Sequence, residues 1–254
     1  MKRIVLIASL FLIGILPLNS QESLANSLFD QANRLYSQND FRTALNLYLE
    51  IADSGYTSPE LLMNIGNSYF KTNDYARAIL YYEKALLLDP SNQDIIFNLS
   101  KAQAYTIDRI EIIPEFFLMS QARRVISSFT SNQWALASVV LLFLTLIVLY
   151  FYLISKVQNR KVTFFSIGVV FLILSISAYS FSHKTRSYVE KSDRAIVMEP
   201  TVTVKGSPDL NGVTVFIIHE GTKISLVRSI DEWVEIKLSD GKQGWVRQSS
   251  FETI

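Results

Sequence analysis

The strongest constraint on the fold of this chain is an internal repeat with a period of 34 residues. The residues identical between its two copies are Leu28 and Leu62, Asn33 and Asn67, Asn39 and Asn73, Asp40 and Asp74, Ala44 and Ala78, and Tyr48 and Tyr82. Small residues at equivalent positions, such as Ala32 and Gly66, allow two helices to cross closely. The Asn-Asp pairs suit a tight turn, because their short side chains bond nearby backbone and tolerate left-handed conformations. The repeat therefore predicts stacked pairs of antiparallel helices.

The period and the residue set resemble those of tetratricopeptide (TPR) units. We expect repeats across residues 21–109, with units at 25–58 and 59–92 and a third helix at 94–107 that caps the last unit. In TPR proteins the first helix of each unit lines a groove that holds a peptide, so the resemblance implies such a groove here. The candidate groove residues are Phe29, Asn33, Tyr36, Met63, Asn67, Phe70 and Lys71. For Tyr36 and Phe70, packing between neighbouring helices is an equal alternative.

The N-terminus has the residue order of a secretory signal. Lys2 and Arg3 precede an apolar run from residue 4 to residue 16, and a short polar segment follows. This order predicts a signal peptide at 1–20 that is cleaved after Ser20. The alternative is an uncleaved membrane anchor. Both interpretations send the repeats out of the cytoplasm.

Two later segments, 134–154 and 162–181, contain no charged residue and are long enough to cross a bilayer. The residues between them carry three basic side chains and no acid, which predicts a cytoplasmic loop. With an exported N-terminus, we expect a bacterial inner-membrane protein whose N- and C-terminal domains face the periplasm. The preceding linker, 110–133, is expected either to lie on the bilayer as an amphipathic helix or to pack on the repeats.

The last sixty residues, 195–254, change to short β-branched runs separated by turn signals, which predicts a small all-β barrel or sandwich. The expected strands are 213–217, 223–227, 233–238 and 243–246. His219-Glu220-Gly221-Thr222 and Gly244-Trp245-Val246 resemble elements of bacterial SH3-like (SH3b) domains. Trp233 and Trp245 are either core residues or a ligand platform, and core is the expected role of at least one, since small barrels need large side chains.

The order of these parts, with the Pro114-Glu115-Phe116-Phe117-Leu118 junction, resembles the BatE family of the Bat (Bacteroides aerotolerance) group. The resemblance implies protein partners, including membrane proteins of the von Willebrand A type and a MoxR-type ATPase. It also implies a link to oxygen tolerance or envelope stress. The alternative is an envelope anchor or sensor whose SH3-like domain binds peptidoglycan.

Composition excludes several other classes of function. The net charge is +1, so no nucleic-acid partner is expected, and the absence of cysteine excludes disulfides and thiolate chemistry. The two histidines lack ligand-like neighbours, and no phosphate-binding loop or nucleophile elbow occurs. We therefore expect a non-enzymatic protein without cofactor or metal. Its expected fold is multi-domain, with all-α TPR repeats, a two-helix transmembrane hairpin and a small all-β SH3-like barrel.

Overall fold

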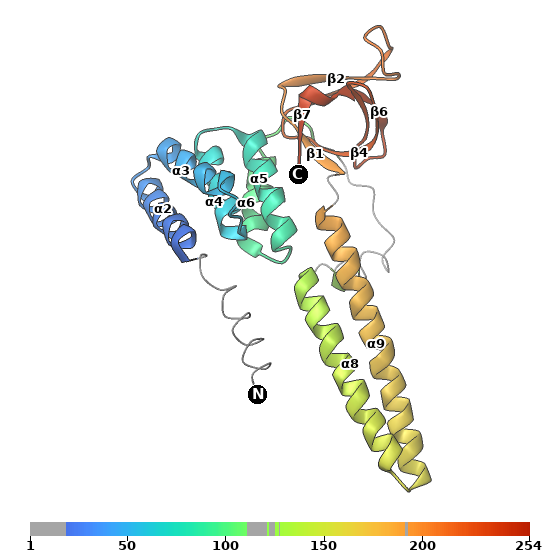
Figure 1. The fold of residues 1–254 in the computed structure, drawn as a ribbon. Helices are drawn as coiled ribbons and strands as arrows, with labels where there is room; N and C mark the ends of the chain where they lie inside the picture. Colours follow the sequence, from blue (N-terminus) through green and yellow to red (C-terminus); the bar gives the residue numbers. More distant parts are fainter. Residues whose placement is uncertain (1–18, 111–120, 122–124, 127, 191–192) are drawn as a thin grey trace, which may run out of the picture.

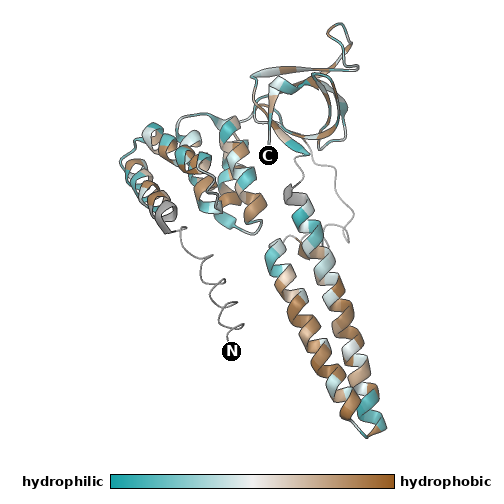
Figure 2. Ribbon diagram, viewed as in Figure 1, coloured by the Kyte–Doolittle hydropathy of each residue, from teal (hydrophilic) through white to brown (hydrophobic). Residues whose placement is uncertain are grey.

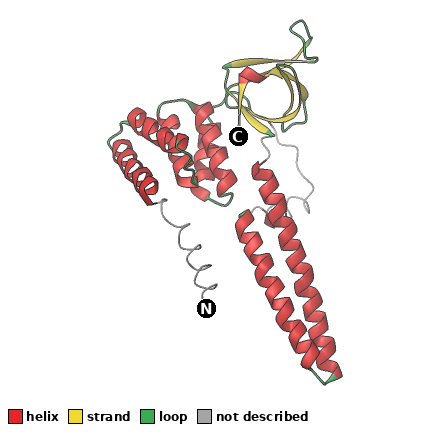
Figure 3. Cartoon of the chain, in the orientation of Figure 1, coloured by secondary structure: helices red, strands yellow, loops and turns green. Residues whose placement is uncertain are grey.

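The computed structural model describes every residue except 1–18, 111–120, 122–124, 127 and 191–192. The predicted signal peptide therefore lies almost wholly outside the described residues, as does most of the predicted amphipathic linker. The described chain has a helical N-terminal part, two long helices and a C-terminal sheet (Figures 1 and 3). This confirms the multi-domain, helix-plus-sheet architecture.

Five helices form the repeats, and Figure 1 shows them stacked from α2 to α6. They are α2 (Asn19–Ser37), α3 (Phe41–Asp53), α4 (Pro59–Lys71), α5 (Tyr75–Leu88) and α6 (Gln93–Gln103). The turns α2–α3 and α4–α5 are built alike: Asn39 and Asn73 both have φ of 65°. The next residue in each copy, Asp40 or Asp74, caps the following helix by accepting a backbone N–H bond. The repeated Asn-Asp pair thus ends one helix and begins the next.

Small residues lie where the helices of each unit cross. Ala44 and Ala78 are fully buried, and Gly66 on α4 faces the ring of Tyr82 on α5. A Cβ atom at residue 66 would lie 2.7 Å from that ring. Tyr82 therefore fills the volume that a larger residue 66 would need.

Helix α6, the third of the first helices, covers the end of the second unit, and its outer side bears two exposed polar residues and the partly exposed Ile96. Ile95 and Ala102 are fully buried against the repeats. Ser100 and Gln103 are exposed, whereas Gly66 at the position equivalent to Ser100 is buried beneath α5. No second helix follows in register in the described residues, so this outer side of α6 ends the stack.

Two helices, α8 (Ser131–Ile154) and α9 (Gln158–Glu190), are long and apolar enough to cross a membrane by length and composition. They form an antiparallel hairpin and are apolar over most of their length (Figure 2). Ser138 and Ser175 each donate a hydroxyl bond to the other's carbonyl oxygen, at 3.0 and 2.9 Å. These bonds satisfy polar groups between helices that otherwise present apolar side chains.

The hairpin differs from the sequence expectation in two respects. Only residues 155–157 separate the helices, so Arg160 and Lys161 lie in the first turn of α9 rather than in a loop. At its other end α9 continues past the apolar stretch to Glu190. The sequence pattern marks only the apolar part of a helix, whereas backbone hydrogen bonding continues into the polar flanks.

The C-terminal region is an antiparallel sheet that curls into a ring (Figure 1). Its strands are β1 (Arg194–Val197), β2 (Thr201–Lys205), β3 (Thr214–His219), β4 (Lys223–Ile230), β5 (Trp233–Lys237), β6 (Gln243–Arg247) and β7 (Phe251–Thr253), in the spatial order β3-β2-β6-β5-β4-β1-β7. The pattern located β3 to β6 and missed β1, β2 and β7. β1 and β7, of four and three residues, carry too few alternating residues to be recognised singly.

We predict that Gly66→Leu lowers the free energy of unfolding of the repeats by about 1–3 kcal/mol or more, because the new side chain overlaps the Tyr82 ring. Ser100→Leu is the matched control, since residue 100 is one repeat later and exposed. Chemical denaturation followed by far-UV circular dichroism measures both. Equal stabilities for the two variants would contradict the close crossing of α4 and α5.

Candidate functional site

The first helices of the repeats are joined by side-chain amides. Asn33 on α2 accepts a hydrogen bond from the hydroxyl of Tyr48 on α3 at 2.6 Å. The same Asn33 Oδ1 accepts a second bond from Asn64 Nδ2 on α4 at 3.3 Å. One asparagine is thus oriented by the second helix of its own unit and by the first helix of the next.

This arrangement recurs one repeat later. Asn67 Oδ1 accepts bonds from the Tyr82 hydroxyl at 2.7 Å and from Asn98 Nδ2 on α6 at 3.1 Å. We call the four asparagines Asn33, Asn64, Asn67 and Asn98 the amide floor. Two members had been predicted as groove residues from their period, and the structure brings both to the junctions between first helices.

The tyrosines keep the amide floor in one orientation. Burial raises the pKa of Tyr48 to about 12, and it also raises the pKa of Tyr82. Both hydroxyls therefore remain protonated donors at physiological pH. Because each bonded asparagine accepts through Oδ1, its Nδ2 is left free of any protein hydrogen bond among the described residues.

Two aromatic candidates for the groove, Tyr36 and Phe70, pack against other aromatic rings of the repeats. Tyr36 lies edge-on to Phe41 at 5.0 Å between ring centroids, and Phe70 lies edge-on to Tyr75 at 5.5 Å. Phe70 also contacts Tyr105 of the last turn before the linker, at 5.6 Å. Each of the two rings thus contacts an aromatic ring of the neighbouring helix.

The remaining candidates lie at the edges of this face. Phe29 packs edge-on against Tyr48 at 5.7 Å and lines a hollow of about 340 Å³ between α2 and the start of α4. Met63 is partly buried. The Lys71 ammonium lies 5.6 Å from the centroid of the Phe41 ring.

Sequence reasoning missed two residues on α6. Phe97 is 66% exposed and lies one period after Met63, and the Lys101 ammonium is 5.3 Å from the Phe70 ring centroid. The signal was present, since the 34-residue period continues from Met63 to Phe97 and from Asn64 to Asn98. Helix α6 was expected only to cap the last unit, but one of its sides also adjoins the groove.

A second polar site lies where the sheet meets the repeats. The carboxylate of Asp108 accepts bonds from the His219 backbone N–H and the Thr222 hydroxyl, both at 2.6 Å, and lies 2.8 Å from His219 Nδ1. Burial alone would raise the pKa of Asp108, but the bonds from Thr222 and His219 together outweigh it and lower that pKa. The His-Glu-Gly-Thr turn thus binds a carboxylate of the same chain.

Further contacts hold the same turn against α5. Lys223 pairs with the largely buried Glu83 of α5 at 2.6 Å. Gly221 has φ of +82°, and a Cβ there would lie 2.5 Å from the Thr106 side chain. Ile196 of β1 is fully buried within the core of the repeats. The turn that resembles the SH3b family is therefore the surface by which the sheet packs on the helices.

The two tryptophans of the sheet are largely buried, at 8% exposed for Trp233 and 5% for Trp245. They alternate with Val234 and Val246, which belong to the sheet's hydrophobic core. Arg247 lies over the Trp233 ring at 5.8 Å. Arg228 covers Trp245 at 5.2 Å and pairs with Glu235 at 2.6 Å.

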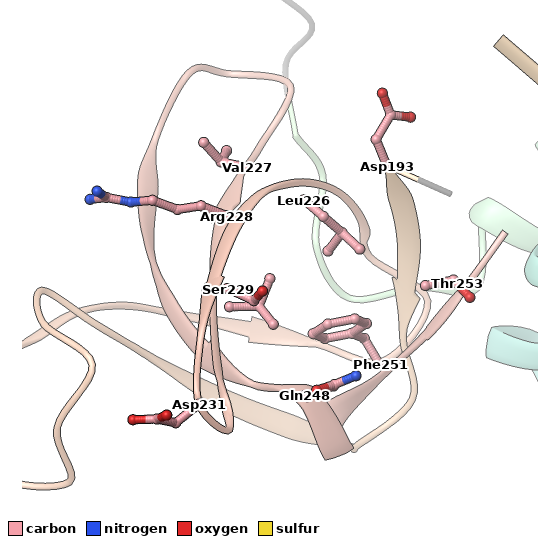
Figure 4. Close-up of a pocket in the computed structure, with 10 residues that line it drawn as sticks. Asp193, Leu226, Val227, Arg228, Ser229, Asp231, Gln248, Phe251 and Thr253 are labelled. Carbon is pink, nitrogen blue, oxygen red and sulfur yellow. The ribbon is translucent and has the colours of Figure 1, made fainter. Parts of the chain in front are cut away.

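An open hollow of about 340 Å³ lies at one end of the sheet, and it contains neither tryptophan (Figure 4). Leu226 and Phe251 lie together within it, and Gln248 and Thr253 are polar residues at its edge (Figure 4). The hollow combines an apolar wall with hydrogen-bonding groups, as small-molecule sites do.

Within the described ranges, no group of three or more His, Asp or Glu residues is placed to hold a metal ion. His219 is engaged by Asp108. The polar clusters of the described residues bind other parts of the chain or face open surface.

Comparison with known proteins identifies one repeat. The tetratricopeptide repeat family matches residues 59–92, the span of α4 and α5. The chain contains a TPR unit. No curated protein matches the chain. The match covers the second unit. The first unit repeats the sequence of the second at a distance of 34 residues, and the same tyrosine–asparagine hydrogen bond occurs in both.

We predict that Asp108→Asn weakens the contact between sheet and repeats by about 1–3 kcal/mol, because the bonds from His219 and Thr222 lose their charged acceptor and an amide NH2 replaces the second carboxylate oxygen. The folded-state pKa of Asp108 is lowered, so its contribution is fully present above the ordinary value of 3.8 and is lost as the pH falls through the lowered value. Unfolding of the intact protein as a function of pH measures this. Asp209→Asn in the exposed β2–β3 turn is the control. A pH dependence identical in wild type and Asp108→Asn would contradict the assignment.

Proposed function

We propose that the chain is a non-enzymatic, membrane-anchored scaffold that binds a protein partner through the first-helix face of its repeats. The observation that carries the proposal is the amide floor. Buried tyrosine hydroxyls orient its asparagines, so free amide groups are presented at fixed positions beside an exposed Phe97. Pre-oriented hydrogen-bonding groups lose little entropy when a peptide backbone binds them.

The α8–α9 hairpin supplies the anchor in this proposal. β1 begins four residues after α9 ends, and Ile196 of β1 lies in the core of the repeats. The SH3-like domain would then hold the groove at a set position above the bilayer, on the periplasmic side. The resemblance to the BatE family supports a place in a Bat-type aerotolerance or envelope-stress complex, with von Willebrand A-type membrane proteins as partners.

A second candidate function is that of an envelope anchor or sensor that binds peptidoglycan through the SH3-like domain. The open hollow beside Leu226 and Phe251 favours it, because this is a polar-edged site unused by the domain contact (Figure 4). Co-sedimentation of the detergent-solubilised protein with purified cell-wall sacculi tests it. Leu226→Asp should abolish sedimentation if the hollow is the site, and absence of sedimentation by the wild type would exclude this function.

We predict that Phe97→Ala combined with Asn98→Ala reduces recovery of cross-linked membrane partners at least about tenfold, as expected when an anchor residue is removed. Phe97 is exposed and Asn98 partly so, so the folded protein should persist with a stability loss of about 1 kcal/mol or less. Leu210→Ala, which truncates a similarly exposed side chain on the β2–β3 turn, is the control. Unchanged recovery with intact folding would move the binding function away from the repeats.

We predict that reporter fusions at Gln21, Gln158 and Ile254 report outside, inside and outside. The apolar lengths of α8 and α9 and the basic residues near their junction motivate this topology. Paired alkaline phosphatase and fluorescent-protein fusions distinguish the two compartments. A cytoplasmic signal at Ile254 would contradict the predicted orientation, and a cytoplasmic signal at Ile254 with an outside signal at Gln21 would contradict two crossings.

A further inference from the structure

The first-helix face carries charged residues at regular positions on either side of the amide floor. On α4, Glu60, Asn64, Asn67 and Lys71 follow at helical spacings of four, three and four, so they share one side of the helix. Because Asn64 and Asn67 bond the neighbouring first helices, this side is the one that adjoins α2 and α6. Along it the residue type changes from acid to amide to base.

The next first helix, α6, repeats the order. On α6, Asp94, Asn98 and Lys101 occupy the corresponding side, and Asp94 lies one 34-residue period after Glu60. Across α4 and α6 this makes an acidic row at the helix beginnings and a basic row nearer their ends. The acidic row is Glu60 and Asp94, and the basic row is Lys71 and Lys101.

The charges of both rows are available to a partner. All four side chains are exposed, and within the described residues none forms an ion pair with another part of the chain. The two lysines are held over the rings of Phe41 and Phe70, on the far side of the floor from the acids. Acids in a first turn and bases in a last turn favour any helix through its dipole. On α4 and α6, however, the charged residues lie only on the side that bears the amide floor, so they form one surface with it.

We propose that the partner is an extended peptide segment in which basic and acidic residues alternate. Such a segment would lie along the amide floor, across the first helices. Successive side chains of an extended chain point to opposite sides. Basic side chains therefore meet the acidic row while acidic side chains meet the basic row. The amide floor bonds the backbone between them. This inference rests on the proposed peptide-binding function and specifies its ligand.

Two synthetic peptides of ten residues, acetylated and amidated, test the proposal. One alternates Lys and Glu, and the other has the same composition as a block of five Lys and a block of five Glu. Both have no net charge, so attraction to the protein as a whole is matched. Titration calorimetry with the intact protein in detergent should give an affinity at least about fivefold higher for the alternating peptide, and the difference should shrink as salt is added.

A charge exchange on α4 provides the matched variants. Glu60→Lys with Lys71→Glu interrupts both rows without changing net charge and should remove the preference for the alternating peptide. Glu199→Lys with Lys237→Glu, an exchange between exposed residues of the C-terminal domain, should leave it unchanged. If the α4 exchange unfolds the helix, Glu60→Gln with Lys71→Gln serves in its place.

Equal affinities for the two peptides, or no measurable binding of either, would overturn the inference about charge. The proposed function would still stand if Phe97→Ala with Asn98→Ala abolished partner recovery. Loss of the preference in the sheet variant as well would also overturn the inference, because the two rows would then not be its source.

Discussion

The close crossing of α4 and α5 leaves no room for a side chain at residue 66, and the ring of Tyr82 occupies that space. The same tyrosine carries its hydroxyl to Asn67, on the side of α4 that faces the neighbouring first helices. Packing inside the unit and hydrogen bonding at its surface are therefore made by one residue. The amide floor keeps its orientation because the tyrosine beneath it cannot rotate within a close-packed core. The first unit repeats the arrangement with Tyr48 and Asn33.

The position of the sheet depends on its contact with the repeats. A fully buried Ile196 and the turn around Gly221 place the sheet against α5, and Asp108 and Glu83 supply carboxylates to that turn. Removing one member of such a contact leaves a partner with unmet hydrogen bonds, so the groups support one another. The contact covers α5 and leaves the first-helix face open. β1 is the first strand after α9, and it is also the strand that packs against the repeats. β1 therefore links the apolar hairpin to the helical stack.

Sequence reasoning recovered the repeated units, the turns and the two apolar helices, because each is encoded by local pattern. Asn33 and Asn67 were singled out by period alone. Their bonds to Tyr48 and Tyr82 could not be foreseen, since partners fifteen residues apart meet only after two helices pack. The His-Glu-Gly-Thr turn was recognised as distinctive, but its role in holding two domains together depends on Asp108, more than a hundred residues away. Strands β1 and β7 were missed for the same reason: each is short and becomes a strand by pairing with strands distant in the sequence.

The sequence by itself determined the helix-turn-helix repeat, the positions of the apolar helices and the all-β character of the last sixty residues. These follow from periodicity, turn chemistry and runs of apolar residues, which act over a few neighbours along the chain. Only the tertiary structure decided which side of each helix is free, which carboxylates are bound by the sheet, and that both tryptophans lie beneath arginines. Those outcomes depend on how separately formed elements fill space against one another, and close packing couples residues that no local pattern connects.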